Sequence, residues 1–396
     1  MATISRTQGA ELRQIGYGCA ALGLCILLTS CDPVAGIPAG DELVILAPPA
    51  PNAPSIPDPG STDDEIDSHS NTTADNTTTG ETSSGGSTTH KPMLLATMTH
   101  MEISFIDDRD EEMFLAHVEQ LRYGMDLADE FTAKLTIESE KPFARANTTW
   151  GLNMLREVID RGHGVGTHCD IGFHDPAVSV EQFAIRLAEN KELVDALVGP
   201  ENNRGFSGGG GFSDWAAAGA LAGYEYVDGI VGLHYLSMPM SARPDNTWTD
   251  EYILETAYHD QAPVDLLDRI YPFKVADGRD FTADEDGVIL VSSGELGRVD
   301  RLAEEAAGEE CGANCPLTTE DVDLALATII DIAAQRDPTR LTKLTYYFAI
   351  NNFDPQNVGV LRSFFSRTKA LQDSGILTWA TQGDVLDAYN ADAAQP

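Results

Sequence analysis

The chain of 396 residues carries 63 Asp and Glu against 25 Lys and Arg, which gives a formal net charge of −38. This excess of negative charge argues against nucleic acid and anionic lipid surfaces as partners. The length exceeds what one compact core needs, so a large domain with additional segments is expected.

Residues 1–30 predict an export signal. Arg6 and Arg13 precede an apolar run at 16–28 that is shorter than the roughly 20 residues a membrane-spanning helix needs. The run ends in Leu-Thr-Ser-Cys, which resembles the lipobox of bacterial lipoproteins. The resemblance implies cleavage before Cys31, lipidation of Cys31 and a place in the cell envelope, in the periplasm or on the cell surface. An ordinary secretory signal or a short membrane anchor is the alternative.

Residues 31–90 predict an acidic, disordered linker. The segment 32–90 contains ten Asp or Glu, no Lys or Arg, and is rich in Pro, Ser, Thr, Gly and Asn. Too little apolar surface is present to offset the entropy of ordering the chain. We therefore expect a flexible tether between a lipid anchor and the domain at 91–396.

Strand-like and helix-like patterns alternate through 91–396. Strands are predicted at 93–99, 133–137, 165–168, 226–232, 287–293 and 343–350, and helices at 110–131, 148–162, from 179 onward, and at 319–335 and 357–373. Such alternation predicts an α/β fold with parallel strands and crossover helices. The irregular stretch at about 233–285 is expected to be an insertion over one end of the sheet.

Two predicted strands end in a His-x-acid pair. His100 and Glu102 follow the first strand, and His168 and Asp170 end the strand at 165–168. Residues i and i+2 face the same side of a strand, and parallel strands build active sites at their carboxyl ends. Imidazole and carboxylate groups suit Zn²⁺ or a similar divalent ion. The alternative is a structural His–Asp pair in a polar loop.

Three nearby groups add further possibilities. His174 lies six residues after His168 and is another candidate ligand, whereas His163 is expected to face solvent or to cap the carboxyl end of the helix that stops at Gly162. Asp107 and Asp108 are rival carboxylates, or a charged loop before the next helix.

The cysteines agree with an oxidising compartment. Cys311 and Cys315 are close enough in sequence to form a disulfide, and Cys169 is expected to stay reduced because it has no obvious partner.

The segment 154–174 resembles the polysaccharide deacetylases, a family in which a helix, a Gly-His-x-x-Gly run and a strand deliver the first metal histidine. The helix pattern at 181–199 and the Gly-rich run from 205 are similar to the parts that follow. The resemblance implies an irregular (β/α) barrel and the removal of acetyl groups from acetylated polysaccharide or peptidoglycan. It also implies a divalent metal, Zn²⁺ being expected, with His168 as the first histidine and Glu102 in the place of the metal aspartate.

The chain departs from the family's pattern in four places, one of which is that no Leu-x-His motif appears near 288–293. Met101 stands where the family has its catalytic base, position 172 is Gly where a second histidine is usual, and the third motif is Gly-rich. Asp170 or His174 would have to act as the further ligand. The base would be His100, Asp170 or His174, and we favour His100 because it lies two residues from Glu102 and titrates near neutral pH.

Two other functions are considered. The run GFSGG at 205–209 matches Gly-x-Ser-x-Gly, so Ser207 could be an esterase nucleophile with Asp228 and His234 or His259 as partners. The missing motifs also allow a glycan-binding lipoprotein on a degenerate, non-catalytic barrel.

Overall fold

The computed structural model describes residues 90–172, 174–280, 286–308 and 315–394. The predicted signal peptide, Cys31 and the predicted linker up to residue 89 lie outside the described residues. No helix within the described ranges has both the length and the apolar character needed to cross a bilayer.

Strands and helices alternate along most of the chain, as the sequence predicts. The strands are β1 (Met93–His100), β2 (Thr136–Ser139), β3 (Gly164–Cys169), β4 (Gly205–Gly208), β5 (Tyr226–Val227), β6 (Phe273–Val275), β7 (Ile289–Val291), β8 (Glu295–Arg298), β9 (Thr342–Tyr347) and β10 (Thr378–Trp379). The α-helices are α1 (Glu111–Glu130), α2 (Lys141–Thr149), α3 (Met154–Asp160), α4 (Val180–Val198), α5 (Trp215–Leu221), α6 (Asp250–Tyr252), α7 (Leu266–Arg269), α8 (Leu302–Ala307), α9 (Thr319–Gln335), α10 (Val358–Asp373) and α11 (Gln382–Ala393). Short 3₁₀ or π turns are η1 (Gly232–Ser237), η2 (Met240–Ala242), η3 (Ile253–Ala257), η4 (Val299–Arg301), η5 (Ile350–Asn352) and η6 (Pro355–Asn357).

The strands form one sheet in the order β6-β7-β5-β4-β3-β2-β1-β9-β8, with β10 beside β1. All neighbouring pairs are parallel except β6 and β7. Parallel neighbours require crossover connections, which the helices between them supply. Their carboxyl ends therefore meet at one end of the sheet.

The sheet closes into a barrel through one bent segment. β7 pairs with β5, whereas β8 pairs with β9, and only residues 292–294 separate β7 from β8. Gly294 makes this passage possible because its φ is +97° and a Cβ there would lie 2.0 Å from the carbonyl oxygen of Lys343. The barrel is therefore irregular: one stretch of chain serves as a strand on both sides of the closure.

The amino end of the barrel is covered by β10 and α11. β10 pairs with the start of β1 at Leu94 and Leu95, and β2 pairs with the end of the same strand at Thr99 and His100. The backbone N–H of Gln382, the first residue of α11, donates to the hydroxyl of Thr136 on β2. The carboxyl ends of the strands are thus opposite this covered end.

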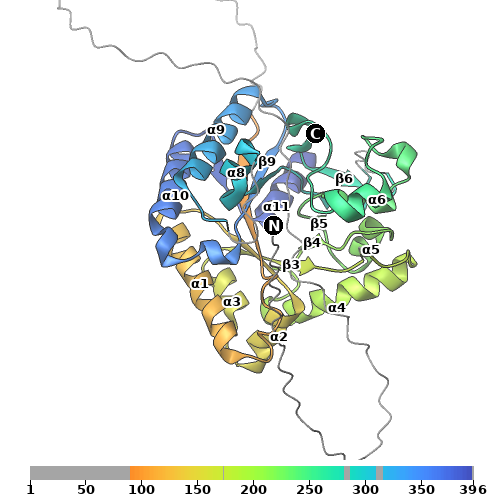
Figure 1. Ribbon diagram of the computed structural model, residues 1–396, viewed down its shortest axis with the longest axis horizontal. Helices are drawn as coiled ribbons and strands as arrows, with labels where there is room; N and C mark the ends of the chain where they lie inside the picture. The colour runs from red at the N-terminus through yellow and green to blue at the C-terminus, as the bar shows by residue number, and fades with distance from the viewer. Residues whose placement is uncertain (1–89, 173, 281–285, 309–314, 395–396) are drawn as a thin grey trace, which may run out of the picture. The chain divides into compact units, whose positions relative to one another are not determined.

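Helices surround the strands in Figure 1. One apolar cluster joins β1, β2 and β9 to α1, α2, α3, α9 and α10, and a second joins β4, β5 and β7 to α4, α5 and the segment after β5. These two clusters form the core on the outer face of the barrel. The predicted irregular (β/α) barrel is confirmed.

Several predicted elements need correction. The helix predicted at 148–162 is two helices, because Gly151 has φ +70° and Asn153 caps α3 with its side chain. β4 was not predicted, because Gly205–Gly208 has no apolar strand pattern; it forms because β3 and β5 pair with its two sides. The predicted insertion at about 233–285 contains short helices and turns and the antiparallel strand β6.

Candidate metal centre

Three predicted site residues meet at the carboxyl ends of β1 and β3. One ligand atom each from His100, Glu102 and His168 lies within 4.8 Å of the others. The Nδ1 atom of His100 is 2.9 Å from Oε1 of Glu102, and Nε2 of His168 is 3.3 Å from the same oxygen. The two imidazole rings stack with centroids 4.0 Å apart. Glu102 itself lies in the turn after β1.

The second nitrogen of each ring is linked to the buried carboxylate of Glu138, directly for His100 and through the Ser207 hydroxyl for His168. Nε2 of His100 lies 3.0 Å from Oε2 of Glu138, whose side chain is fully buried. Nδ1 of His168 is 2.7 Å from the hydroxyl of Ser207, and that hydroxyl donates to Glu138. Because the Ser207 hydroxyl donates to Glu138, it accepts from Nδ1 of His168, and the carboxylate of Glu138 likewise favours a proton on Nε2 of His100. The opposite nitrogens, Nδ1 of His100 and Nε2 of His168, both face Glu102 and would offer lone pairs to a cation once each ring carries a single proton.

Strand register explains how these side chains meet. His100 is opposite Glu138 in the β1–β2 pair, and His168 is opposite Ser207 in the β3–β4 pair. Gly166 makes room for Glu138, because a Cβ at this position would lie 3.1 Å from the Glu138 Cγ. The side-chain amide of Asn190, on α4, donates to the carbonyl oxygen of His168 at 2.6 Å and fixes the end of β3.

At His100 and at Glu102, burial and the neighbouring groups shift the pKa in opposite directions, and the neighbouring groups have the larger effect. Burial of His100 disfavours its charge, but Glu138 and the hydrogen bond to Glu102 outweigh it and raise the pKa of His100 to about 10. Burial acts against ionisation of Glu102 as well, yet contacts with His100 and His168 hold its pKa well below the usual range. The cluster thus favours positive charge on His100 next to an ionised Glu102.

Glu140 is a further carboxylate of the site. Its Oε1 lies 3.7 Å from Nε2 of His168. Although Glu140 is the N-cap residue of α2, its side chain makes no capping hydrogen bond, so the carboxylate is not held at the helix end. Burial is the main cause that raises its pKa to about 7, and the charges of Asp170 and Glu102 add to the effect. A carboxylate with this pKa is suited to proton transfer near neutral pH.

Other predicted residues lie outside the three-residue cluster. Asp170 lies just after β3 and is exposed as a residue, but neighbouring atoms partly desolvate its carboxyl, and this, with the charge of Glu102, raises its pKa. His174 is exposed in a turn.

His163 is buried rather than solvent-facing, and its Nδ1 accepts from the backbone N–H of Leu135. Asp107 is buried 2.8 Å from His117, and Asp108 lies beside Arg109.

The predicted serine-esterase arrangement is not assembled. Ser207 is 5% exposed and stands between His168 and Glu138, whereas a nucleophilic serine donates to a histidine that in turn donates to the acid. His234 instead contacts the backbone of Val231 and Gly208. Oδ1 of Asp228 is buried without a hydrogen-bond partner among the described residues.

The cysteine predictions have different outcomes. Cys169 is free, as predicted, and it is buried. Cys315 is disulfide-bonded, but Cys311 lies outside the described residues, so their pairing stays a prediction.

Sequence reasoning missed Glu138 and Glu140, and it gave Ser207 a nucleophilic role instead of its place between His168 and Glu138. Glu138 and Glu140 form the same i, i+2 pair as His100 and Glu102, directly after the strand predicted at 133–137. That pattern was the available signal, and β2 extends two residues further than predicted.

The fold and the site together define an irregular (β/α) barrel with a candidate divalent-metal centre at the carboxyl ends of its strands. No family model and no curated protein sequence matches the chain. A solved structure described as a polysaccharide deacetylase from Mycobacterium smegmatis is similar, with 14% identity, a TM-score of 0.44, and coverage of 78% of this chain and 93% of that one.

Two further structures are similar at the same level. One is described as a polysaccharide deacetylase from Pseudomonas aeruginosa PAO1 (12% identity, TM-score 0.44, 76% of this chain and 91% of that one). The other is PuuE allantoinase (12% identity, TM-score 0.44, 76% of this chain and 90% of that one).

Proposed function

We propose that the chain is a metal-dependent hydrolase that removes acetyl groups from acetylated glycans. One observation carries the proposal: lone-pair atoms of His100, Glu102 and His168 converge, while the other ring nitrogens of both histidines are held by Glu138 and Ser207. Two histidines and one carboxylate match the ligand set of catalytic Zn²⁺ sites, which use three protein ligands and keep a position open. Zn²⁺ is therefore our first choice of ion.

The residues around the ligands would act as follows. Glu138 holds His100 directly and His168 through Ser207, so both rings keep the orientation and tautomer that a cation needs. A bound divalent cation would lower the pKa of a water and polarise the acetyl carbonyl. We assign proton removal to Glu140 in place of His100, because His100 belongs to the ligand cluster and Glu140 lies 3.7 Å from His168.

The glycan class and the location rest on the sequence. The resemblance at 154–174 favours acetylated polysaccharide or peptidoglycan as substrate. The lipobox-like run at 28–31 supports anchoring through Cys31, which would place the domain in the cell envelope. Palmitate labelling of the expressed chain should disappear in Cys31→Ser, and labelling that persists would rule out this anchor.

The function is tested with the purified protein and its matched variants. Elemental analysis should find about one bound divalent ion per chain in the wild type and in His90→Ala, which removes an exposed histidine outside the cluster. His168→Ala should lose the ion. Acetate release from acetylated glucosamine oligomers or acetylxylan should stop on chelation and return when metal is restored.

The outcomes separate the candidate functions. Activity that resists chelation but is lost in Ser207→Ala would replace the metal hydrolase with a serine esterase. Bound glycan without acetate release by metal-loaded protein would leave a glycan-binding protein. Absence of both metal and glycan binding would contradict the proposal altogether.

A further inference from the structure

A tyrosine and an arginine stand beside the candidate metal centre. Tyr347 ends β9 and Arg298 ends β8, and the parallel pairing of these two strands places the two residues in register. On its other side β9 pairs with β1, the strand that ends at His100. Both residues therefore belong to the carboxyl end of the barrel, where the ligand cluster lies.

The ring of Tyr347 packs against both His100 and Arg298. Its centroid lies 4.8 Å from the centroid of the His100 imidazole, and the two ring planes are tilted by 52°. The guanidinium carbon of Arg298 lies 5.9 Å from the centroid of the same tyrosine ring. An arginine cation within about 6 Å of an aromatic face is attracted to it. One ring thus joins a residue of the ligand cluster to a cation.

The Tyr347 hydroxyl is available to a ligand. Tyr347 is partly exposed, and within the part of the chain that the structure describes its hydroxyl makes no hydrogen bond. The charge of Glu102 acts on this hydroxyl more strongly than the charge of Arg298 does. The hydroxyl is therefore within electrostatic reach of the ligand cluster.

Arg298 is held in place by a buried carboxylate. Its Nε and one terminal nitrogen donate to the two oxygens of Asp300, at 2.6 and 3.0 Å. The side-chain amide of Asn352 donates to the same carboxylate at 2.8 Å. Asp300 is completely buried, so water does not compete for these bonds. A bidentate pair of this kind fixes the plane of the guanidinium.

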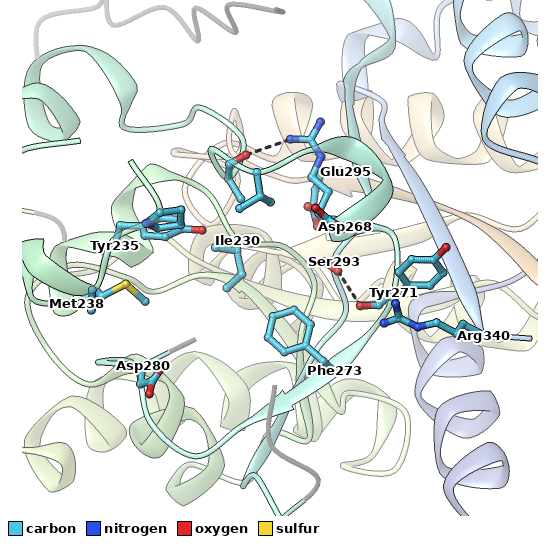
Figure 2. A pocket seen from close by; sticks show the side chains of 15 residues that line it. Ile230, Tyr235, Met238, Asp268, Tyr271, Phe273, Asp280, Ser293, Glu295 and Arg340 are labelled. Atoms are coloured by element: carbon cyan, nitrogen blue, oxygen red, sulfur yellow. Dashed lines mark hydrogen bonds between the residues drawn. The ribbon is translucent and has the colours of Figure 1, made fainter. Parts of the chain in front are cut away.

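The cavity at the opposite end of β8 is a separate feature. Its volume is about 410 Å³, and Glu295, the first residue of β8, lines it together with Tyr271 and Phe273 (Figure 2). Neither Arg298 nor Tyr347 lines this cavity, and no residue of the ligand cluster does so. The end of β8 at Arg298 is the one that adjoins the cluster.

A hydrogen-bond donor at this place would serve the hydrolysis of an acetyl group. Attack of water on the acetyl carbon moves negative charge onto the acetyl oxygen, and a donor aimed at that oxygen stabilises the transition state. The carboxylates of the site, Glu102, Glu138 and Glu140, can only accept when they are ionised. A phenol keeps its proton at neutral pH, so Tyr347 can donate.

We propose that Tyr347 is a catalytic residue whose hydroxyl donates a hydrogen bond to the acetyl oxygen while negative charge develops there. The proton stays on the phenol throughout, and no bond to Tyr347 forms or breaks. Arg298 is a positioning residue that holds the tyrosine ring, and Asp300 and Asn352 hold Arg298. This role rests on the proposed function, because it needs an acetylated substrate at the cluster.

Tyr347→Phe tests the donor because it removes the hydroxyl and keeps the ring beside His100. We expect the variant to retain zinc affinity and the KM for acetylated glucosamine oligomers, and to lose about 100- to 1000-fold in kcat. Tyr346→Phe is the matched control, since Tyr346 points to the other face of β9 and its hydroxyl donates to the carbonyl of Ala325. The control should keep the kcat of the wild type even where its thermal midpoint falls.

Arg298→Gln tests the positioning role. We expect kcat to fall about tenfold when Tyr347 is present and to stay unchanged when the same substitution is made in the Tyr347→Phe background, because no hydroxyl is then left to position. A residue that only stabilised the fold would lower kcat by the same factor in both backgrounds, and that result would contradict the positioning role.

A binding measurement without turnover separates this role from the proposed function. Methylphosphonate has a methyl group and negatively charged oxygens on a tetrahedral centre, which imitates an acetyl group after water has added to it. By calorimetry, zinc-loaded wild type and Tyr346→Phe should bind it alike, and zinc-loaded Tyr347→Phe at least about tenfold more weakly.

The outcomes are distinguishable. Methylphosphonate binding that depends on Tyr347, without acetate release from any glycan, would support the donor and contradict the hydrolase. Acetate release with the same kcat in the wild type and in Tyr347→Phe would overturn the donor and leave the hydrolase. Equal binding of methylphosphonate by these two proteins, or no binding by either, would overturn the donor whatever the activity.

Discussion

Replacing Ser207 by alanine separates the metal hydrolase from the serine esterase in one experiment. The change removes the contact of 2.7 Å to Nδ1 of His168 and the hydrogen bond to Glu138. Both contacts are buried, so water does not readily replace them. A buried group left without its partner costs about 1–3 kcal/mol, so we expect the variant to lose roughly 2–4 kcal/mol of unfolding free energy.

The same change should weaken metal binding because His168 loses the group that orients its ring. Loss of such an outer partner reduces metal affinity by about 10- to 100-fold, or about 1.4–2.7 kcal/mol. Zinc affinity can be measured by competition with a chromophoric chelator, and the unfolding free energy by denaturant titration. At saturating metal the variant should recover a large part of its deacetylase activity.

Ser237→Ala is the matched control. The Ser237 hydroxyl also lies within hydrogen-bonding distance of two groups, but these are the backbone carbonyls of His234 and Gly278, between which its single proton is shared. It should lower stability and leave zinc affinity unchanged. If Ser207→Ala kept the zinc affinity of the wild type and lost about 10⁶-fold in activity, Ser207 would be a nucleophile and the orienting role would be wrong.

Three more predictions follow from the geometry. Glu102→Gln should abolish stoichiometric metal binding because it removes the only carboxylate in the ligand cluster, whereas Glu112→Gln on the exposed part of α1 should retain it in the same elemental analysis. Burial lowers the pKa of Lys343 to about 8, so between about pH 8 and its unfolded value near 10.5 the unfolded chain binds more protons and stability rises with pH. Lys343→Met should lack this rise, of up to about 1.4 kcal/mol per pH unit, and identical pH slopes in denaturant titrations would contradict the lowered pKa. Gly294→Ala should lower the thermal midpoint far more than Gly308→Ala, since a Cβ at 294 overlaps a backbone carbonyl and one at 308 has no heavy atom within 4 Å; equal shifts in calorimetric scans would show that the barrel closure adapts.

Sequence patterns predicted the barrel where local signals agree with packing. α9 begins and ends at the predicted residues, because Thr318 caps it through Asp321 and an apolar stripe runs along it. The pattern failed at 148–162, where apolar spacing continues through Gly151 although the backbone turns there. The spacing of apolar residues alone does not show where the backbone changes direction.

Part of the site could also be predicted, because there too a local sequence pattern agrees with the fold. His100, Glu102 and His168 were found because i, i+2 spacing at strand ends is visible in sequence. Ser207 was assigned the wrong partners because β4 has no strand-like composition. Gly205 is needed there, since the Tyr226 ring lies 1.9 Å from where its Cβ would be, and only the folded sheet shows that contact.

The bent segment at 289–298 affects how the polypeptide can be re-ordered. Its first half belongs to the β5 side of the barrel and its second half to the β9 side, so covalent continuity joins the two sides at this point. A circular permutant with new termini at 292–294 would separate these sides, and the barrel would depend on hydrogen bonds such as the one from Lys343 N–H to the Ile270 carbonyl. New termini at Gly375, which lies in a turn after α10 and has no heavy atom within 4 Å of an added Cβ, would keep the covalent link between β7 and β8 intact. Comparing the unfolding cooperativity of the two permutants therefore measures how far it depends on the covalent link at 292–294.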